Sequence, residues 1–308
     1  MKAERAIAAQ GLAYSALALA LGFSAASLPA LPPTTEIVLV AALVLVLGVP
    51  HGAFDTLYAR RLLGLSGWRG WSLFGLVYWA AAALVVAAWA LAPTLFLAGF
   101  LLASLAHFSG DPEGRAAPFT RIAMGGAPIV LPTLLHEAEV ARLFGLLVGA
   151  EPARVVADAL AAGAWPFVLL VALGVVWETH RDRGRTALEL GATATVAILA
   201  PPLLAFAAYF CLMHSARHIL RTARAARTTS AAALAAIAAA PMLGTLALAG
   251  AAWLFLADVA LDARVMQVLF VGLAALTAPH MALVEQARLR GWALSEEPAG
   301  EGRPEPAE

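Results

Sequence analysis

The chain has 308 residues, of which 62% are hydrophobic and only 13% are charged, and its formal net charge is zero. Soluble domains are nearer half apolar and a quarter charged, so the composition predicts an integral membrane protein built as one all-α bundle. The balanced charge argues against nucleic acid as a partner. The single cysteine, Cys211, excludes an intramolecular disulfide and a cysteine-based zinc site.

Apolar runs long enough to cross a bilayer follow one another along most of the chain. A span needs roughly 20 apolar residues. The first run is interpreted as a retained span, because it lacks a clean small-residue cleavage site. Prolines break the series near Pro93, at Pro128 and Pro132, and at Pro201-Pro202. The sequence predicts ten spans, at about 6–28, 35–57, 72–91, 93–109, 121–135, 162–179, 186–200, 202–221, 231–256 and 265–286.

Two segments differ from this pattern. Residues 136–160 intersperse charged residues with apolar ones, which is typical of amphipathic helices at the membrane interface. Residues 295–308 are rich in proline, glutamate and glycine and are predicted to form a disordered cytoplasmic tail. Residues 1–294 are predicted to form a single transmembrane domain.

Basic residues divide unequally between the two sides that ten spans would create. The side of both termini holds seventeen of them, and the other side holds only Arg142, Arg154 and Arg264. This bias follows the positive-inside rule and predicts cytoplasmic termini in a multi-pass protein of the inner (cytoplasmic) membrane. The larger set is Lys2, Arg5, Arg60, Arg61, Arg69, Arg115, Arg121, Arg181, Arg183, Arg185, Arg217, Arg221, Arg224, Arg227, Arg288, Arg290 and Arg303.

Five of the seven histidines fall in four short motifs near the cytoplasmic ends of even-numbered spans. In each motif a histidine precedes a basic residue by seven to nine positions, or roughly 12 Å of helix, so the sequence predicts one layer of imidazoles. His136 and His180 lie outside this layer and are expected at the surface. The motifs are Pro50-His51-Gly52-Ala53-Phe54-Asp55, Ala106-His107-Phe108-Ser109-Gly110-Asp111, His214-Ser215-Ala216-Arg217-His218 and Pro279-His280-Met281.

The histidine layer has the composition of a metal site. His214 and His218 are four residues apart, so they share one face of a helix. His51 and His107 complete a set of four nitrogens in this interpretation. An all-imidazole site suits iron, copper, zinc or nickel more than magnesium or calcium.

Three further residues are candidates for supporting this set. Asp55 follows His51, and Asp111 follows His107, each by four positions. Either carboxylate is placed to accept the second N–H of an imidazole, which fixes ring orientation, or simply marks a helix end. His280 is a fifth ligand, a supporting group or a packed core residue, and the second interpretation is favoured.

Aromatic residues near the motifs predict an apolar substrate pocket. Phe54 and Phe108 adjoin motif histidines, and Phe206 and Tyr209 lie one or two turns before His214. Most other aromatic residues are interpreted as packing and interface residues.

Functions other than metal-dependent catalysis are also compatible with several of these features. A single membrane histidine commonly hydrogen-bonds a neighbouring helix, or serves as a proton relay in a transporter. A bis-histidine haem carrier is a further alternative. A di-iron desaturase or hydroxylase needs about eight histidines in characteristic boxes, whereas this chain has one HxxxH pair.

The motifs together resemble those of the Brp/Blh family, the bacterial and archaeal membrane β-carotene 15,15′-dioxygenases. Residues 50–55 match the PHGAxD signature, and residues 214–218 are similar to the HSxRH motif. His107-Phe108 with Gly110-Asp111 looks like the second motif, from which Ser109 departs somewhat. Pro279-His280 is similar to the C-terminal element. The resemblance covers residues from about 35 to 290, in the same order.

This resemblance implies a polytopic enzyme whose non-haem Fe²⁺ is held by His51, His107, His214 and His218. It implies that O₂ cleaves the central 15,15′ double bond of β-carotene to give two molecules of retinal, which a rhodopsin in the same lipid bilayer would receive. The chain is not itself a rhodopsin of the usual kind, because its only lysine is Lys2 and no transmembrane lysine is available for a Schiff base.

Overall fold

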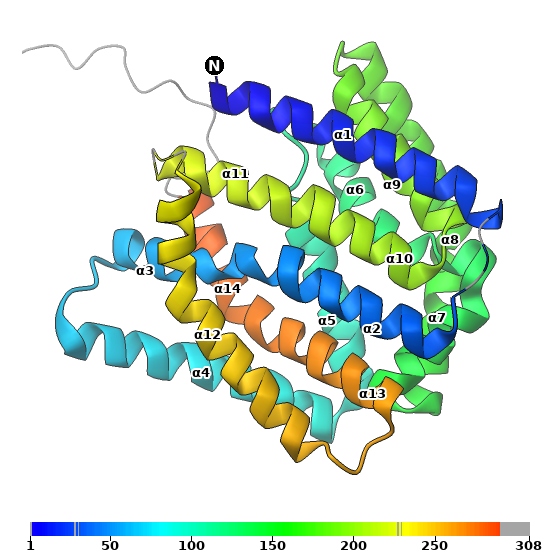
Figure 1. Ribbon diagram of the computed structural model, residues 1–308. Coiled ribbons are helices and arrows are strands. Elements are labelled where there is room, and N and C mark those ends of the chain that lie inside the picture. Colours follow the sequence, from blue (N-terminus) through cyan, green and yellow to red (C-terminus); the bar gives the residue numbers. More distant parts are fainter. Residues whose placement is uncertain (1, 28, 30, 227, 229, 290–308) are drawn as a thin grey trace, which may run out of the picture.

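The computed structural model describes residues 2–27, 29, 31–226, 228 and 230–289, and every regular element within those ranges is a helix (Figure 1). The all-α prediction is therefore confirmed for the described part of the chain. The predicted tail, 295–308, and the last residues of the predicted domain lie outside the described residues.

Eight of the elements are α-helical over their whole length, apart from a kink at His136 in one of them. They are α1 (Lys2–Ser24), α4 (Gly67–Leu91), α5 (Pro93–Phe108), α6 (Pro118–Val130), α7 (Thr133–Val148), α8 (Ala150–His180), α9 (Gly184–Leu199) and α12 (Ala231–Phe255). A short 3₁₀ turn, Ala25–Ser27, follows α1.

Three longer rods are composite, because wide or tight turns join their α-helical parts. The first joins α2 (Pro33–Leu43) to α3 (Asp55–Leu63) through a π turn (Val44–Gly48) and a 3₁₀ segment (Val49–Phe54). The second joins α10 (Pro202–Ala207) to α11 (Ala216–Ala225) through a π segment (Ala208–Ser215). The third joins α13 (Leu261–Met266) to α14 (Gly272–Leu289) through a π turn (Gln267–Val271). Such turns are frequent at functional sites.

Seven helical rods in the described residues are long and apolar enough to cross a membrane. The predicted spans at 93–109, 121–135 and 186–200 correspond to α5, α6 and α9, which have 16, 13 and 16 residues and are shorter than these seven rods. The seven rods are Glu4–Ser27, Pro33–Leu63, Gly67–Leu91, Ala150–His180, Pro202–Ala225, Ala231–Phe255 and Leu261–Ala287.

Prolines and one glycine set the helix boundaries. The predicted breaks at Pro93 and Pro201-Pro202 are confirmed, since α5 begins at Pro93 and α10 begins at Pro202. The prediction of interfacial helices over 136–160 is wrong for its second half, because α8 starts at Ala150 and continues unbroken through the predicted sixth span. Gly149 makes the turn between α7 and α8 with a φ of 88°, a conformation that glycine adopts without strain.

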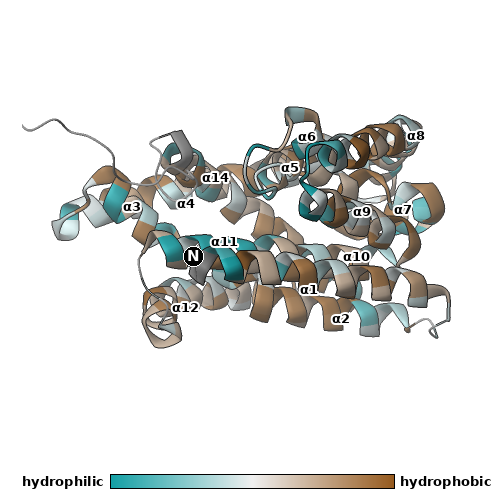
Figure 2. Cartoon of the chain, turned by 90° about the horizontal axis from the view of Figure 1, so that it is seen from above, coloured by the Kyte–Doolittle hydropathy of each residue, from teal (hydrophilic) through white to brown (hydrophobic). Residues whose placement is uncertain are grey.

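The composite rods lie side by side with α1 and form the centre of the bundle (Figure 1). Helices α6 to α9 pack as a second group along one side, and α4 and α12 lie at the outside. In α4 and in α12, very few residues of the apolar stretch are buried against the rest of the protein. Hydrophilic residues gather on α3 and α11 and around α6, while most helical surface is apolar (Figure 2). Exposed apolar side chains on outer helices are expected where lipid is the solvent.

The loops and helix ends that the charge bias assigns to one side also meet in space. Arg61 donates to the carbonyl oxygen of Ala225 over 2.9 Å, which joins the ends of α3 and α11. Arg221 pairs with Glu113 in the loop after α5, over 3.4 Å. Arg183 donates to the backbone carbonyl of Arg115. These contacts agree with the predicted segregation of charge.

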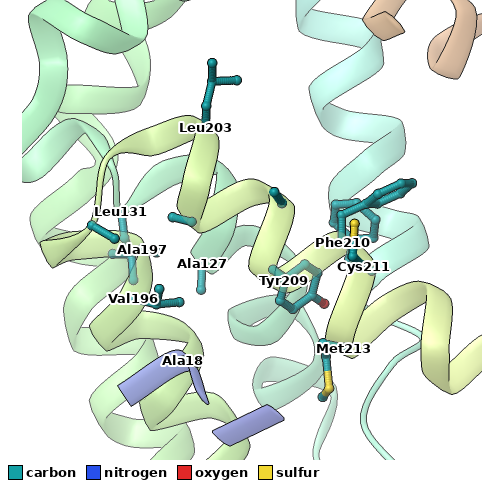
Figure 3. Packing of buried hydrophobic residues seen from close by; sticks show 14 of the residues in the cluster. Ala18, Ala127, Leu131, Val196, Ala197, Leu203, Tyr209, Phe210, Cys211 and Met213 are labelled. Atoms are coloured by element: carbon teal, nitrogen blue, oxygen red, sulfur yellow. The ribbon is translucent and has the colours of Figure 1, made fainter. Parts of the chain in front are cut away.

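The largest apolar cluster joins the central rods to the second helix group (Figure 3). Small residues, among them Ala18, Ala127 and Ala197, are buried at the helix contacts. Small side chains let membrane helices approach closely, and van der Waals packing then stabilises the contact. This packing holds the π segment Ala208–Ser215, which carries Tyr209 and His214, at the centre of the molecule.

Candidate metal centre

All five motif histidines meet at one place in the bundle. His51 lies in the 3₁₀ segment before α3, His107 near the end of α5, His214 in the π segment, His218 in α11 and His280 in α14. The centroids of neighbouring imidazole rings are 4.6–6.5 Å apart. Four separate rods therefore deliver imidazoles to one layer, as the sequence predicted.

The ring nitrogens of this cluster are available to an ion. Within the described residues, the Nε2 atoms of His107, His214, His218 and His280 are buried and have no hydrogen-bond partner. The ligand nitrogens of His51, His107 and His280 lie within 4.8 Å of one another. Because a buried polar nitrogen without a partner is costly, the donor set fits a metal that binds imidazole.

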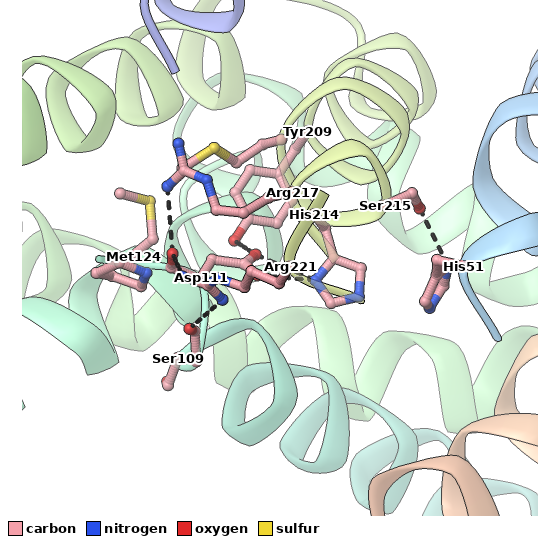
Figure 4. A network of polar contacts seen from close by, with 12 residues as sticks. His51, Ser109, Asp111, Met124, Tyr209, His214, Ser215, Arg217 and Arg221 are labelled. Atoms are coloured by element: carbon pink, nitrogen blue, oxygen red, sulfur yellow. Dashed lines mark hydrogen bonds and ion pairs between the residues drawn. The ribbon is translucent and has the colours of Figure 1, made fainter. Parts of the chain in front are cut away.

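The ring of His214 is held by a buried carboxylate. Its Nδ1 donates to Asp111, with distances of 3.0 and 3.1 Å to the two carboxylate oxygens. The hydroxyl of Tyr209 donates to the same carboxylate over 2.7 Å (Figure 4). Because a carboxylate only accepts, Nδ1 carries the proton and Nε2 keeps its lone pair for a metal.

The ring of His280 is held by a second arrangement of the same kind. Its Nδ1 donates to Asp55 over 2.6 Å, and the hydroxyl of Tyr78 donates to the other carboxylate oxygen over 2.8 Å. Asp55 thus supports His280 on another helix, and Asp111 supports His214. This differs from the expected pairing with His51 and His107, because the 3₁₀ segment and the end of α5 do not continue the helical spacing of four residues.

The backbone fixes the ring of His51. Its Nδ1 lies 2.6 Å from the carbonyl oxygen of Gly48 and 3.1 Å from the hydroxyl of Ser215. The carbonyl can only accept, so Nδ1 is the protonated nitrogen and Nε2 is free to face the other histidines. Gly48 adjoins the ring of Phe210 so closely that a Cβ atom there would collide with it.

Buried arginines hold the loop that carries Asp111. Arg221 donates to the carbonyl oxygens of Gly110 over 2.9 Å and of Asp111 over 2.7 Å. Burial alone would raise the pKa of the Asp111 carboxyl, but His214, Tyr209 and Arg221 together hold this pKa below its ordinary value. The carboxylate is therefore charged and able to orient His214.

A bidentate ion pair lies behind this loop. Arg217 is completely buried and binds both carboxylate oxygens of Glu189 in α9, over 2.7 and 2.9 Å. It also donates to Gln10 in α1 over 3.0 Å and to the carbonyl oxygen of Asp111 over 3.2 Å. Three helices and the Asp111 loop are thereby tied together. Gly11 leaves room for the pair, since a Cβ atom there would overlap the Glu189 carboxylate.

A cavity of about 300 Å³ opens beside the histidines. His51, His107 and His280 lie in its wall, which is otherwise mainly apolar and aromatic. Cavities of this size with a few convergent polar groups are typical of small-molecule sites. The other lining residues are Val49, Gly52, Ala53, Asp55, Thr56, Phe74, Gly75, Tyr78, Trp79, Phe100, Ser104, Phe108, Phe206, Phe210, Ala240, Pro241, Met242, Thr245, Leu273, Leu276 and Thr277.

The aromatic residues predicted for a pocket divide into two pairs. Phe108 and Phe206 line the cavity. Phe54 instead packs in a buried apolar cluster with Tyr58, and Tyr209 uses its hydroxyl to hold Asp111, so neither belongs to the described cavity wall. Tyr78, which the sequence suggested only as a packing residue, lines the cavity and anchors Asp55.

The two histidines outside the motifs have different environments. His180 is exposed at the end of α8, as predicted. His136 is only partly exposed, and its Nε2 is buried without a hydrogen-bond partner in the described structure. The expectation of a plain surface residue is wrong for His136, because it lies at a kink in α7, with φ of −129°.

If His280 binds a metal ion, asparagine in place of Asp55 is expected to lower the affinity for that ion by roughly 10–100-fold, because loss of a carboxylate behind a metal-binding histidine has this effect. The measurement is a titration of metal-free protein with divalent metal ions, Fe²⁺ among them, under anaerobic conditions. If Asp55 acts through His280, Asp55→Asn adds little in a His280→Ala background. A full additional loss in that background would contradict the observed pairing.

Comparison with known proteins supports the same interpretation. Residues 42–287 match the family model described as beta-carotene 15,15'-dioxygenase. The chain is 33% identical over 263 residues to the beta-carotene 15,15'-dioxygenase of the uncultured marine bacterium 66A03, covering 79% of this chain and 91% of that protein. It is 29% identical over 321 aligned residues to a probable beta-carotene 15,15'-dioxygenase, Blh, of Halobacterium salinarum, covering 87% and 91%.

No protein of solved structure matches the chain closely. The family match begins at the end of α2 and includes all five motif histidines. The chain therefore belongs to the β-carotene 15,15′-dioxygenase family (Brp/Blh), a family of carotenoid-cleavage enzymes.

Proposed function

We propose that this chain is a multi-pass membrane dioxygenase that uses Fe²⁺ and O₂ to cleave the central 15,15′ double bond of β-carotene. In this reaction the double bond breaks, and each of its two carbons becomes an aldehyde carbon bearing one oxygen atom from O₂. The products are two molecules of retinal. The observation that carries the proposal is the cluster of five converging imidazoles, three of which line an apolar cavity, in a chain of this family.

His51, His107, His214 and His218 are the proposed ligands, and His280 is a fifth candidate. Bound Fe²⁺ would supply the site at which O₂ is activated. Asp111 and Asp55 orient His214 and His280, with Tyr209 and Tyr78 holding the carboxylates in turn. The apolar cavity excludes water and holds a substrate without polar groups by shape and aromatic contact.

The proposed topology places both termini in the cytoplasm and the chain in the inner membrane. The shorter helices α5, α6 and α9, added to the seven long rods, make ten spans, and α7 is then the amphipathic helix on the opposite side. Contacts among Arg61, Arg183 and Arg221 and the loops near them support one shared basic side. Retinal released into this membrane is available to a rhodopsin.

Expression in cells that accumulate β-carotene tests this function directly. We expect β-carotene to be lost and retinal to appear, and the purified protein to carry about one iron per chain. The His218→Ala variant is expected to lose both, while His180→Ala, at an exposed histidine, keeps both. Retinal formation by metal-free protein would overturn the proposal, as would persistent β-carotene beside folded, iron-loaded protein.

A further inference from the structure

A second cavity of about 90 Å³ lies behind the wall of the first. The two cavities share four lining residues, Phe100, Ser104, Phe108 and Phe206, which we call the partition. Among the described residues that line the second cavity, Ser104 is the only polar one. The remaining lining residues are Leu97, Leu101, Pro128, Ile129, Pro132, Val140, Leu143, Phe144, Leu147, Pro202, Leu203, Met266 and Phe270.

The partition is built against the histidine cluster. Ser104 and Phe108 flank His107 on α5, and the ring of Phe108 lies 4.8 Å from that of His214. Phe206 stacks on Phe210 at 5.3 Å, and Phe210 in turn stacks on His214 at 5.7 Å. A ligand that reached from one cavity to the other would therefore pass beside the imidazoles.

The proposed reaction makes a geometric demand on these cavities, and this inference rests on that reaction. Central cleavage of a symmetric rod requires an equally long apolar arm on each side of the bond that breaks. The first cavity offers room for one arm, and the second lies on the far side of the partition. We propose that the second cavity receives the other arm of the carotenoid, and that the partition sets which double bond lies at the histidines.

The side chains of the partition can move aside when a carotenoid arm enters the second cavity. Phe100 and Phe206 are only partly buried, and aromatic side chains move by rotation about two bonds. Because the second cavity is smaller than the first, the second arm displaces these rings as it enters. Phe108 and Phe206 are thus specificity-determining residues that a symmetric substrate contacts on both faces.

Filling the second cavity provides the test. Leu101→Phe on α5 and Ile129→Phe on α6 place extra volume in that cavity and do not touch the first. The matched control is Leu102→Phe, at the neighbouring residue of α5, whose side chain is 67% exposed on the outer face. The two substrates are β-carotene and a shortened apocarotenal that has one intact arm and ends just beyond the central bond.

Both filling variants are expected to lower kcat/KM for β-carotene about tenfold and to change the value for the apocarotenal less than about twofold. The control variant is expected to leave both values unchanged. Binding of β-carotene to metal-free protein, followed by quenching of tryptophan fluorescence, should weaken in the same pattern. Trp79 lies in the wall of the first cavity and provides a reporter.

The outcomes separate this inference from the proposed function. Suppose that the wild-type protein cleaves β-carotene and that both filling variants change kcat/KM by the same factor for the two substrates. The second arm then lies in the bilayer, and the inference is overturned. If only one filling variant folds, the ratio of its kcat/KM values for β-carotene and the apocarotenal, compared with the wild-type ratio, tests the inference by itself. If folded, iron-loaded wild-type protein leaves β-carotene intact, the proposed function itself falls, and this inference falls with it.

Discussion

Replacement of His107 by alanine is expected to remove bound Fe²⁺ and retinal formation together while the bundle stays folded. The Nε2 of His107 is buried without a partner, and within the described residues its ring makes no hydrogen bond to a carboxylate. Its removal therefore deletes a proposed ligand without leaving a buried charge unpaired. The loss of affinity should exceed the roughly 10–100-fold caused by removing an outer hydrogen-bond partner.

Elemental analysis and anaerobic Fe²⁺ titration measure this effect, and circular dichroism with thermal unfolding checks the fold. The His136→Ala variant serves as the control, because that partly buried histidine lies on α7, outside the motifs. His214→Ala is a poorer test, since it also removes the imidazole that is paired with the buried Asp111 carboxylate. Full iron content in folded His107→Ala protein would show that this imidazole is not a ligand.

Breaking the Arg217–Glu189 pair is expected to destabilise the protein more than any change at the cavity wall. Both side chains are buried, with at most 1% exposure, so Glu189→Leu leaves an uncompensated guanidinium inside the bundle. Removal of one partner of a buried ion pair typically costs about 3–5 kcal/mol. We expect Glu189→Leu to show a clearly lower Tm in detergent and poorer yield than the wild-type protein.

The double variant Glu189→Leu, Arg217→Met separates stability from positioning. Replacing both charges by apolar side chains should restore most of the lost Tm, because neither charge then remains unpaired. Iron affinity should stay below that of the wild-type protein, since Arg217 no longer donates to the Asp111 carbonyl. A double variant as unstable as Glu189→Leu would show that the pair itself, and not an orphaned charge, stabilises the fold.

Composition and hydropathy predict the helical class and most helix ends, because a bilayer leaves the backbone few other choices. Pro93 and Pro202 mark their helix starts as expected. The start of α8 at Ala150 was missed, because charged residues in its first turns look interfacial when read as sequence. The π and 3₁₀ turns around His51 and His214 were also missed, since no residue pattern specifies them.

The common depth of the motif histidines was predictable from their equal distances to basic residues, but a common depth does not show that the imidazoles face one another. Their partners were not predictable, since a spacing of four predicts contacts only within a regular helix. Asp55 therefore supports His280 from another rod. A usable signal did exist for the ion pair: Glu189 is a lone acid within an apolar run, and such a residue needs a partner. No sequence pattern singles out Tyr78.

The outermost helices, α4 and α12, also contribute Phe74, Trp79 and Thr245 to the cavity beside the histidines. Both helices also carry exposed leucines, so in the proposed membrane setting a hydrocarbon solute would reach the cavity from the acyl chains without crossing water. The occupancy of the cavity then depends on the mole fraction of the hydrocarbon solute among the lipids. A Michaelis constant given as a concentration in the whole sample would therefore change with the amount of lipid in the assay as well as with the protein.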